Sequence, residues 1–352
     1  MTKTYEAVFM RPHTAFHLGE KGIGLEESAQ VIHADTLFSA LCNVWVRCHG
    51  RSDLEDLLSA FREGAPPFLL SSAFPCAWGI PFFPKPAGRF RLPEGEDVKK
   101  LKDMDFVSRG ILEKILNDEE LTDSAWLQGN LWLTKEEAKI IVEAAERSAN
   151  QRLEPDALRF WAVQEVPRVR LDRTTHASEI FYFSRVVFSE GCGFLFLIRY
   201  LDEAWRDKLA TVVRVLGDTG IGGDRTVGYG LFEPVLEQVS LRMPEEAPHF
   251  ATLSLLSPCR EDIQKGLLDG DVAYNLVVRD GWIFSPDARA YRRRSVRMFG
   301  EGSIFAGGAE TSYGRLVDVS PTEPEVRLSH PIYRYGYAFP VPIVMVGREE
   351  EA

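Results

Sequence analysis

The segment Gly217-Asp-Thr-Gly-Ile-Gly-Gly-Asp-Arg-Thr-Val-Gly-Tyr-Gly230 decides most of what this chain can be. Six glycines fall within these fourteen residues, between a helical pattern and a strand pattern. Such glycine density indicates positive φ angles or very close approach by another group. Successive backbone N–H groups in such a loop can form an anion-binding concavity that suits phosphate. The alternative is a mobile hairpin connection, but Asp224, Arg225 and Tyr229 add chemistry that a plain linker does not need.

Two common phosphate-binding motifs are excluded by inspection. A Walker A loop needs G-x-x-x-x-G-K-S/T, and no lysine or serine follows the glycines here. The dinucleotide fingerprint needs G-x-G-x-x-G at the start of a helix, whereas Arg225 stands where the third glycine belongs. The segment also follows a helix instead of opening one. A nucleotide-dependent enzyme of either type is therefore not expected.

Length and composition are those of an ordinary globular protein. The 352 residues can form two domains or one large one, with 45% hydrophobic and 26% charged residues. No stretch approaches the roughly 20 apolar residues that span a bilayer, and the first residues lack a signal-peptide pattern. The five cysteines form no C-x-x-C pair, and the seven histidines have no metal-ligand spacing. We therefore expect a cytoplasmic protein without a disulfide framework, metal or cofactor, and without a membrane partner.

The formal net charge of -11 argues by itself against a nucleic-acid partner, but the charges are segregated. Acidic residues crowd into 94–105, 118–123 and 349–351. Arginines concentrate in 159–173 and 289–297, and no acidic residue interrupts the second stretch. Either cluster alone can be a solvated face. Together with the glycine segment they favour a polyanion, and arginine favours bidentate phosphate contacts or stacking on bases.

The first third of the chain begins with a strand and a helix. Alternating residues predict a strand over Thr4–Arg11. Asp35 is positioned to cap a helix with an apolar stripe from Leu37 to Cys48, and Gly50 should end this helix. Residues from about 97 to 150 read as helices, notably Thr134–Ala149, within an insertion at about 84–160.

A second series of elements leads into the glycine segment. Phe194–Tyr200 reads as a buried strand, and Asp202 caps a helix that Gly217 should stop. The next strand is expected over Leu231–Leu241. The combined order β-α-β-β-α-β predicts a ferredoxin-like (RRM-type) unit over residues 1–243, with one sheet face left free for a ligand.

Pro244 and Pro248 mark a boundary, after which short strands predominate. The expected strands are Thr252–Leu256, Val272–Val278, Trp282–Phe284, Ser295–Phe299, Leu316–Val319 and Tyr333–Val346. No repeat of fixed period is visible, so a second ferredoxin-like domain over residues 244–352 rests on element order alone. The predicted fold class is α+β, with two ferredoxin-like domains.

These features resemble the RAMP superfamily of CRISPR RNA-binding subunits, in which a strand, a helix and a glycine loop lead into a strand. Three further segments are similar to the fourth Csm subunit of type III-A effector complexes: His17–Gly22 with Leu25–Ser28, His33–Leu41, and the aromatic tail Gly336–Pro342. Pro167–Thr175 also resembles the RNA-contacting stretch of that family. The resemblance covers nearly the whole chain.

The resemblance implies a non-catalytic subunit in antiviral defence that caps the 5′ tag of the guide RNA (crRNA). It implies contacts with the large polymerase-like catalytic subunit and with the first backbone subunit of the Csm complex. It also implies two ferredoxin-like domains and a β-hairpin thumb, for which residues 166–185 and 80–92 are both candidates. The acidic net charge and the helical region at 97–150 depart from the family pattern.

Several residues are candidates for RNA contact. On a strand, Arg168 and Arg170 would share a face and offer guanidiniums to phosphates, although an edge strand can also use charge against aggregation. Asp35 and His33 either order the helix start or lie where a phosphate approaches the first-turn amides. The predicted RNA contacts are His17, Gly19, Lys21, His33, Asp35, Arg168, Arg170, Arg173, Thr174, Thr175, Gly220, Gly222, Gly223, Asp224, Arg225, Gly228, Tyr229, Arg293 and Arg294.

Three functions remain open at this point. The principal hypothesis is a non-catalytic subunit that holds the guide-RNA tag through the glycine segment and the 168–175 strand. The alternative is a metal-independent endoribonuclease that processes guide RNA, with Tyr229, His17 or His33 as the general base. The third is a scaffold whose arginines meet protein, and the cluster around Arg293 and Arg294 fits either RNA or an acidic neighbouring subunit.

Overall fold

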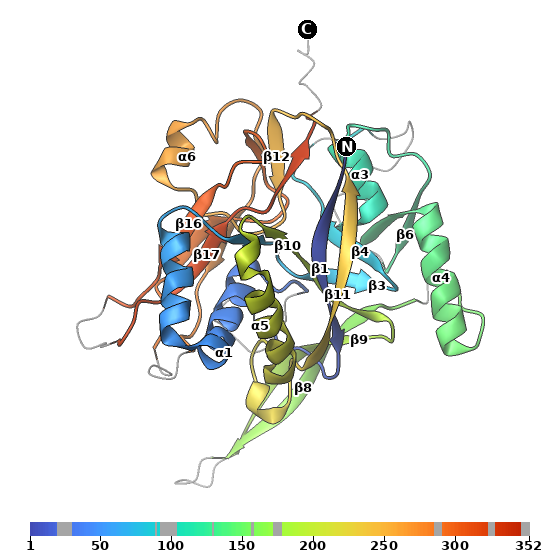
Figure 1. Cartoon of the computed structure of the whole chain (residues 1–352). Helices are drawn as coiled ribbons and strands as arrows, with labels where there is room; N and C mark the ends of the chain where they lie inside the picture. Colours follow the sequence, from blue (N-terminus) through green and yellow to red (C-terminus); the bar gives the residue numbers. More distant parts are fainter. Residues whose placement is uncertain are drawn as a thin grey trace.

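The strand expected near the N-terminus is β1, Thr2–Pro12, and it lies inside a nine-stranded mixed sheet (Figure 1). The computed structural model describes residues 1–19, 30–88, 90–91, 104–128, 130–155, 158–171, 178–284, 291–322 and 328–345. The main path of the sheet runs β11-β1-β10-β3-β4-β5-β7-β6, and β2 also pairs with β10. The fold is therefore mixed α+β, as the sequence predicts. No helix within the described residues has the length and apolar character needed to cross a membrane.

The first part of the sheet combines strands from residues 2–12, 68–77, 192–200 and 232–242. β1 pairs antiparallel with β10, Cys192–Tyr200, on one side and with β11, Phe232–Arg242, on the other. Beyond β10 lie the short strands β2, Phe68–Leu70, and β3, Phe74–Ala77. The strands predicted at 4–11, 194–200 and 231–241 are confirmed; the first two are slightly longer than expected, and the third is shifted by one residue.

Two helices cover one face of this sheet, α1, Ala34–Arg62, and α5, Arg206–Thr219 (Figure 1). Gly50 ends the first helical stretch of α1, as predicted: its backbone is non-helical, with φ 88° and ψ 171°, and a second helical stretch continues beyond this kink to Arg62. Asp35 does not cap α1. The N-cap residue is His33, which makes no side-chain cap bond, and Asp35 lies in the first turn.

The glycine that was expected to stop α5 lies inside it. Asp202 accepts a hydrogen bond from the amide of Ala204 in the short 3-10 turn Glu203–Trp205, as predicted for a cap. The helix then passes Gly217, where an added Cβ would collide with the carbonyl oxygen of Phe232 in β11. Gly217 therefore serves close packing of helix on strand. The turn out of the helix comes at Gly220, with φ 77°.

The insertion contributes strands as well as helices. β4, Ile80–Pro84, pairs with β5, Phe106–Ser108, and the sheet continues through β7, Leu131–Thr134, to β6, Ser124–Leu127. The helices are α3, Arg109–Leu116, and α4, Lys135–Ala149, which begins with a capping box between Thr134 and Glu137. The expectation of an all-helical region at 97–150 is thus wrong for 106–108, 124–127 and 131–134.

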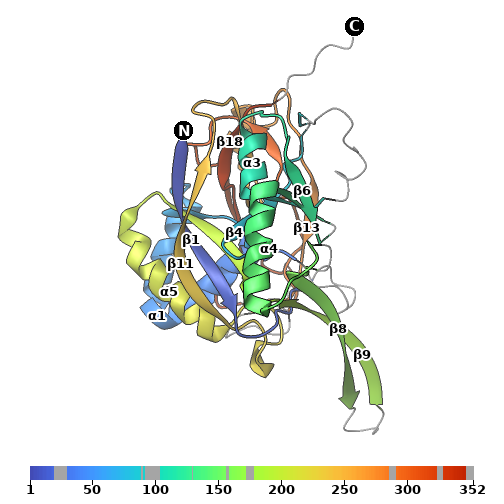
Figure 2. The ribbon, with the colours of Figure 1, turned by 90° about the vertical axis from the view of Figure 1, so that its right-hand side faces the viewer.

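A long β-hairpin leaves the sheet region and projects from the rest of the protein (Figure 2). Its strands are β8, Trp161–Leu171, and β9, Ser178–Phe188, which pair along their whole length. The two strands form a separate two-stranded sheet. Of the two segments named as hairpin candidates, 166–185 lies in this projection, whereas residues 80–84 form β4 of the large sheet.

The C-terminal third consists of small antiparallel sheets. β12, His249–Thr252, lies between β15, Ile304–Ala306, and β18, Pro340–Ile343. Two ribbons pair β13, Leu276–Arg279, with β14, Val296–Phe299, and β16, Gly314–Asp318, with β17, Tyr333–Tyr337. The short helix α6 spans Arg260–Gln264. Of the strands expected here, Thr252–Leu256 and Val272–Val278 lie only partly within strands, and Trp282–Phe284 forms only an isolated bridge at Trp282.

The two sides of the predicted boundary share one hydrophobic core. Tyr335, Tyr337 and Phe339 belong to the same buried cluster as the residues of β1 and α1. The hydroxyl of Tyr335 accepts a hydrogen bond from the amide of Leu70 at 3.0 Å. The domain division at 243/244 remains a prediction.

A buried charge cluster joins α1 to the C-terminal ribbons. The carboxylate of Asp35 is fully buried and forms ion pairs with Arg279, at 2.9 Å, and with Arg334. Burial alone would raise the pKa of Asp35, but the two arginines lower it well below its usual range. A carboxyl whose pKa is depressed on folding stabilises the folded state above about pH 4, and this stabilisation is lost as the pH falls further.

We predict that Asp35→Asn lowers the free energy of unfolding at neutral pH by about 3–5 kcal/mol, because both arginines would remain buried without a counter-charge. Urea unfolding measures the loss. The control is Glu55→Gln, which removes an exposed ion pair with Arg62 and should cost less than about 1 kcal/mol. Equal losses in the two variants would contradict the assignment of Asp35 as the link.

Candidate nucleic-acid interface

The glycine loop proper is 220–230, since 217–219 belong to α5. Gly220, Gly222, Gly228 and Gly230 all have positive φ angles, and so does Asp224 at 55°. At Gly230 an added Cβ would collide with the carbonyl oxygen of Ile221, which lies on the other side of the loop. The expectation of positive φ and close approach is therefore confirmed, and the loop is held by its own backbone.

The close approach comes from the segment that follows β1. The amide of Gly223 donates to the carbonyl of His17 at 2.8 Å, and the amide of Gly230 donates to Ala15 at the same distance. A Cβ at Gly222 or Gly223 would collide with His17. Seven of the eleven amides of residues 220–230 donate to backbone carbonyls of the chain itself. The amides thus mainly hold the loop in place, and its capacity to bind an anion lies in its side chains.

The base of the β8–β9 hairpin packs on this loop. The guanidinium of Arg168 forms an ion pair with Asp224 at 2.8 Å and lies 3.9 Å from the ring centre of Phe183. The ring of Tyr229 is on another side of the same guanidinium, at 5.6 Å, and its hydroxyl accepts a hydrogen bond from Arg185 at 3.3 Å. Loop and hairpin therefore form one unit that carries two arginines.

The histidine before the loop completes this unit. His17 is buried, its Nδ1–H donates to the carbonyl of Ser184 at 2.7 Å, and its ring contacts Phe183 edge-on. His17 therefore acts here as a structural link between β9 and the loop. No atom of the described residues lies within 4 Å of a Cβ added at Gly19.

Arg225 extends the cluster toward the C-terminal third. Its guanidinium stacks on Phe284, 4.1 Å from the ring centre. Burial and then the neighbouring Arg47 of α1 lower the pKa of Arg225. Among the described residues, no carboxylate forms an ion pair with Arg225 or Arg47. Two like charges without a counter-charge favour the approach of an anion.

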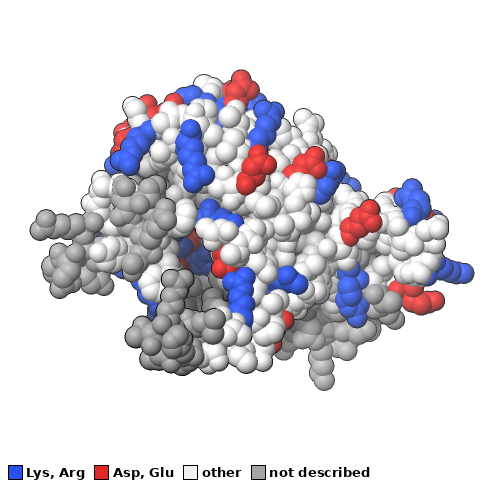
Figure 3. Space-filling model, turned by 90° about the horizontal axis from the view of Figure 1, so that it is seen from below, with Lys and Arg blue, Asp and Glu red and all other residues white. Residues whose placement is uncertain are grey.

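This cluster lies on the face from which the hairpin projects. Figure 3 views that face directly, and Lys and Arg side chains lie around a hollow in it, with the acidic residues more scattered. A protein with a net charge of -11 thus presents locally positive surface beside the glycine loop. Such a surface attracts a polyanion even when the whole chain is acidic.

Other predicted contacts lie elsewhere. His33 bonds through Nδ1 to Glu301 at 2.7 Å, and Asp35 belongs to the buried cluster with Arg279. Arg293 donates to the hydroxyl of Ser39 at 3.0 Å, and burial, followed by the charge of Arg334, lowers its pKa to about 10. Arg294 donates to the carbonyl of Asp318. Lys21, Arg173, Thr174, Thr175 and the side chain of Arg170 lie outside the described residues.

Four residues of the cluster are absent from the predicted contacts: Arg47, Phe183, Arg185 and Phe284. The pairing of β8 with β9 places Phe183 and Arg185 on the same hairpin face as Arg168. A sequence argument that paired the two strands would have found them. Arg47 is one exposed arginine on a long helix, and nothing in its local sequence distinguishes it.

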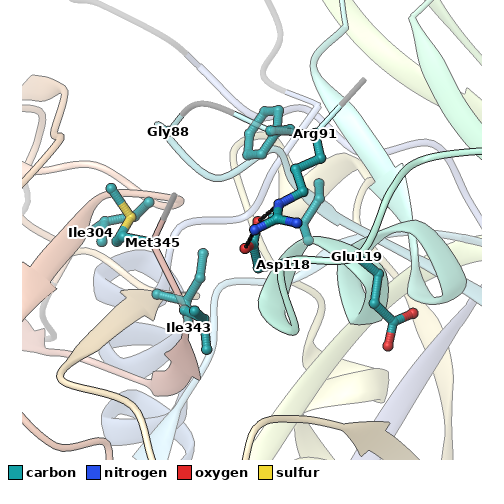
Figure 4. A pocket seen from close by; sticks show the side chains of 10 residues that line it. Gly88, Arg91, Asp118, Glu119, Ile304, Ile343 and Met345 are labelled. Atoms are coloured by element: carbon teal, nitrogen blue, oxygen red, sulfur yellow. Dashed lines mark hydrogen bonds and ion pairs between the residues drawn. The ribbon is translucent and has the colours of Figure 1, made fainter. Parts of the chain in front are cut away.

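The described residues offer no group of metal ligands near the cluster. No group of three or more His, Cys, Asp or Glu side chains that could hold a metal ion occurs in the described ranges. All five cysteines, each in the described part, are free thiols. A small pocket has a volume of about 10 Å³, which is room for one water (Figure 4). It lies between the ion pair of Arg91 with Asp118 and the side chains of Ile304, Ile343 and Met345.

Comparisons with known proteins agree with the architecture of the loop and sheet. Residues 14–233 match the model of the RAMP superfamily, which spans the glycine loop and the hairpin. Residues 245–343 match the model of the CRISPR Csm4 C-terminal domain.

Relatives that match most of the chain identify its family within the RAMP superfamily. Csm4 of Thermococcus onnurineus is 31% identical over 88% of this chain and 90% of its own length. Csm4 of Methanocaldococcus jannaschii is 23% identical over 94% and 95%. The chain therefore belongs to the Csm4 family of the RAMP superfamily, within the type III-A CRISPR systems.

Solved structures share the fold. A Csm3–Csm4 subcomplex of a type III-A interference complex contains a chain that aligns with a TM-score of 0.64 and 21% identity, over 96% of this chain and 99% of that one. A Csm1–Csm4 cassette in complex with cA4 contains one that aligns with a TM-score of 0.59 and 21% identity, over 98% and 100%.

We predict that Gly230→Ala destabilises the protein more than Gly228→Ala. Both residues have positive φ angles, 76° and 92°, so both variants pay about 1–2 kcal/mol for an L-residue in that conformation. Only Gly230 adds a collision with Ile221, whereas nothing lies within 4 Å of a Cβ at Gly228. Urea unfolding of the two variants measures the difference. Equal losses would show that close approach does not constrain the loop.

Proposed function

We propose that this chain is the RNA-binding, non-catalytic subunit of a type III-A effector complex that caps the 5′ tag of the guide RNA. The observation that carries the proposal is the cluster of Arg168, Arg185 and Arg225 on the glycine loop and hairpin base. Arg168 and Arg185 contact Phe183 and Tyr229, and Arg225 stacks on Phe284. Arginines beside aromatic rings suit the phosphates and unstacked bases of single-stranded RNA.

Domain organisation is part of the proposal. The strand order β11-β1-β10-β2/β3, with α1 and α5 on one face, is the order of a β-α-β-β-α-β unit. We assign residues 1–243 to a ferredoxin-like RAMP domain with an insertion, and 244–352 to a second domain. The first assignment rests on strand order and the second on family membership.

The partners follow from the relatives. Csm4 chains of the same fold occur in solved complexes with Csm1 and with Csm3. We propose that this chain likewise bridges the large catalytic subunit and the backbone of its complex. The guide RNA would then run from the cluster of Arg168, Arg185 and Arg225 toward the backbone subunit of the complex.

The β8–β9 hairpin is our candidate for the thumb. One face of the hairpin carries Arg168 and Arg185 toward the glycine loop. The other face exposes Val169, Ile180 and Tyr182, with 58%, 63% and 49% of their surface accessible. Apolar exposure on a projecting ribbon suits contact with unstacked bases or a neighbouring subunit.

We predict that the double variant Arg185→Ala/Arg225→Ala binds tag-bearing guide RNA about tenfold more weakly per lost contact. The slope of log affinity against log salt should fall by about 0.7 for each phosphate contact removed. Fluorescence anisotropy over a salt series measures both quantities.

The matched control is Arg62→Ala/Arg242→Ala, which removes the same charge from exposed pairs with Glu55 and Glu119. It should leave affinity and slope nearly unchanged. If the two double variants behave alike, the arginines of the loop meet protein, and the scaffold hypothesis replaces this one.

Endoribonuclease activity is not expected, because the candidate bases are engaged. His17 is buried with Nδ1 bonded to Ser184, and His33 pairs with Glu301. The Tyr229 hydroxyl accepts from a cation, Arg185. We predict that the purified chain leaves repeat RNA intact in EDTA, as judged by denaturing gel electrophoresis. Specific cleavage that disappears in His17→Ala or Tyr229→Phe would contradict the proposal.

A further inference from the structure

A groove of about 810 Å³ lies on the sheet face away from α1 and α5. Figure 2 shows α4 on the opposite side of β1 and β11 from α5, and the groove runs between the last turn of α4 and the end of β1. Its walls include Phe9, Arg11, Trp78, Arg147, Phe188 and Glu190. The volume lies within the range of ordinary ligand sites, and the groove is open to solvent.

The most unusual residue of the groove is Trp78. It stands in the turn between β3 and β4 with φ 44°, followed by Gly79 with φ 79°. Such turns prefer Asn, Asp or Gly at the first position, and a bulky residue there is strained. Its indole packs over Gly191, where an added Cβ would lie 2.5 Å from Nε1. Trp78 is therefore held in place at a cost, which indicates a role for its side chain.

The chemistry of the groove suits an unpaired nucleotide. Phe9, Trp78 and Phe188 are each partly exposed, and a nucleobase can stack on such rings. The exposed Arg11 forms an ion pair with Glu233 at 2.9 Å through one of its terminal nitrogens. Arg147 donates from Nε to the backbone carbonyl of Glu143 in its own helix, at 3.2 Å. Both retain terminal N–H groups for phosphate. Glu190, which accepts from Ser148 at 2.7 Å, can accept from a base amino group or a ribose hydroxyl.

The groove adjoins the glycine loop. Pro12, which lines the groove, ends β1, and the next residues carry the carbonyls of Ala15 and His17 that hold Gly230 and Gly223. In β9, Phe188 at the groove and Arg185 at the loop are three residues apart, so their side chains lie on opposite faces of the strand. The two surfaces therefore adjoin at the base of the hairpin, and an RNA strand that contacts both must cross from one face of the ribbon to the other there.

We propose that this groove is a second RNA subsite, in which a nucleobase stacks on Trp78 and Arg11 and Arg147 hold the flanking phosphates. The inference rests on the proposed RNA-binding function. The groove adjoins the cluster of Arg168, Arg185 and Arg225 through Pro12 and the residues that follow it, and this proximity to the proposed RNA contacts favours RNA over a protein segment.

The test uses the full chain and two fluorescein-labelled oligouridylates of about 8 and about 16 nucleotides, within the size range of single-stranded binding sites. Trp78→Asn removes the indole and places a residue that tolerates positive φ, so the turn should remain folded. We expect this variant to bind the longer probe at least about fivefold more weakly. Binding of the shorter probe should change less.

Two variants on α4 form a matched pair. Arg147→Ala should weaken the longer probe as Trp78→Asn does. Lys139→Ala removes the same charge two turns earlier, from an exposed pair with Glu143, and should change affinity by less than about twofold. If Trp78→Asn and Arg147→Ala both bind the longer probe like the unmodified chain and the Lys139→Ala control, the proposed subsite is wrong.

The outcomes also separate the subsite from the loop. If Arg185→Ala/Arg225→Ala weakens both probes while Trp78→Asn weakens neither, the loop binds RNA and the groove does not. If Trp78→Asn alone weakens binding, the groove stands and the loop assignment fails. Loss of a co-purified subunit from Trp78→Asn with unchanged RNA affinity would make the groove a protein contact and overturn the inference.

Discussion

In the large sheet, Pro12 at the end of β1 lies opposite Phe232 at the start of β11, and the eleven pairs between these strands hold that register. The loop that precedes β11 is thereby placed beside the residues that follow β1. The carbonyls of Ala15 and His17 then accept from loop amides, and His17 in turn bonds to β9. A slip of one residue would turn every side chain of β11 to the other face and separate these contacts. Loop, hairpin base and groove all depend on this pairing.

Asp224 has a particular place in the charge balance of the loop. It neutralises Arg168 in the free chain, and its left-handed conformation at φ 55° turns its side chain toward the hairpin. The side chains of both partners are about 30% exposed, so this ion pair contributes little to stability. Under the proposed function, a phosphate would share the Arg168 guanidinium with Asp224, against the repulsion between the two anions. Arg225 and Arg47 have no ion-pair partner among the described residues, so no bound carboxylate would oppose the same anion there.

The sequence predicted the parts of this fold that have long, regular patterns. β1, β10, β11, α4 and α5 each contain enough periodic residues to be recognised, and the glycine spacing indicated the tight loop. β5, β6 and β7 have three or four residues each, too few for alternation to appear. They are strands because β5 pairs with the edge strand β4, β7 pairs with β5, and β6 pairs with β7. Gly217 was misjudged because a glycine in a helix can mark a close contact as well as an end. Asp35 was misjudged because its partners, Arg279 and Arg334, are more than 240 residues away.

The contrast between local sequence patterns and long-range contacts also explains which residues of the candidate site could be predicted. The glycines, Arg168, Arg225 and Tyr229 are visible locally, whereas Arg47 and Phe284 join them only through tertiary packing. The partly buried His33 and the fully buried Asp35 are of residue types that would bind RNA at a surface, and their pairing with Glu301 and with two arginines separates the two roles. An arginine that stays accessible beside an aromatic ring loses little hydration and keeps its free donors, so it remains able to bind a phosphate. Arg279 and Arg334 have no such capacity, because both are already bonded to the buried carboxylate of Asp35, and an incoming phosphate would have to displace that carboxylate from the core.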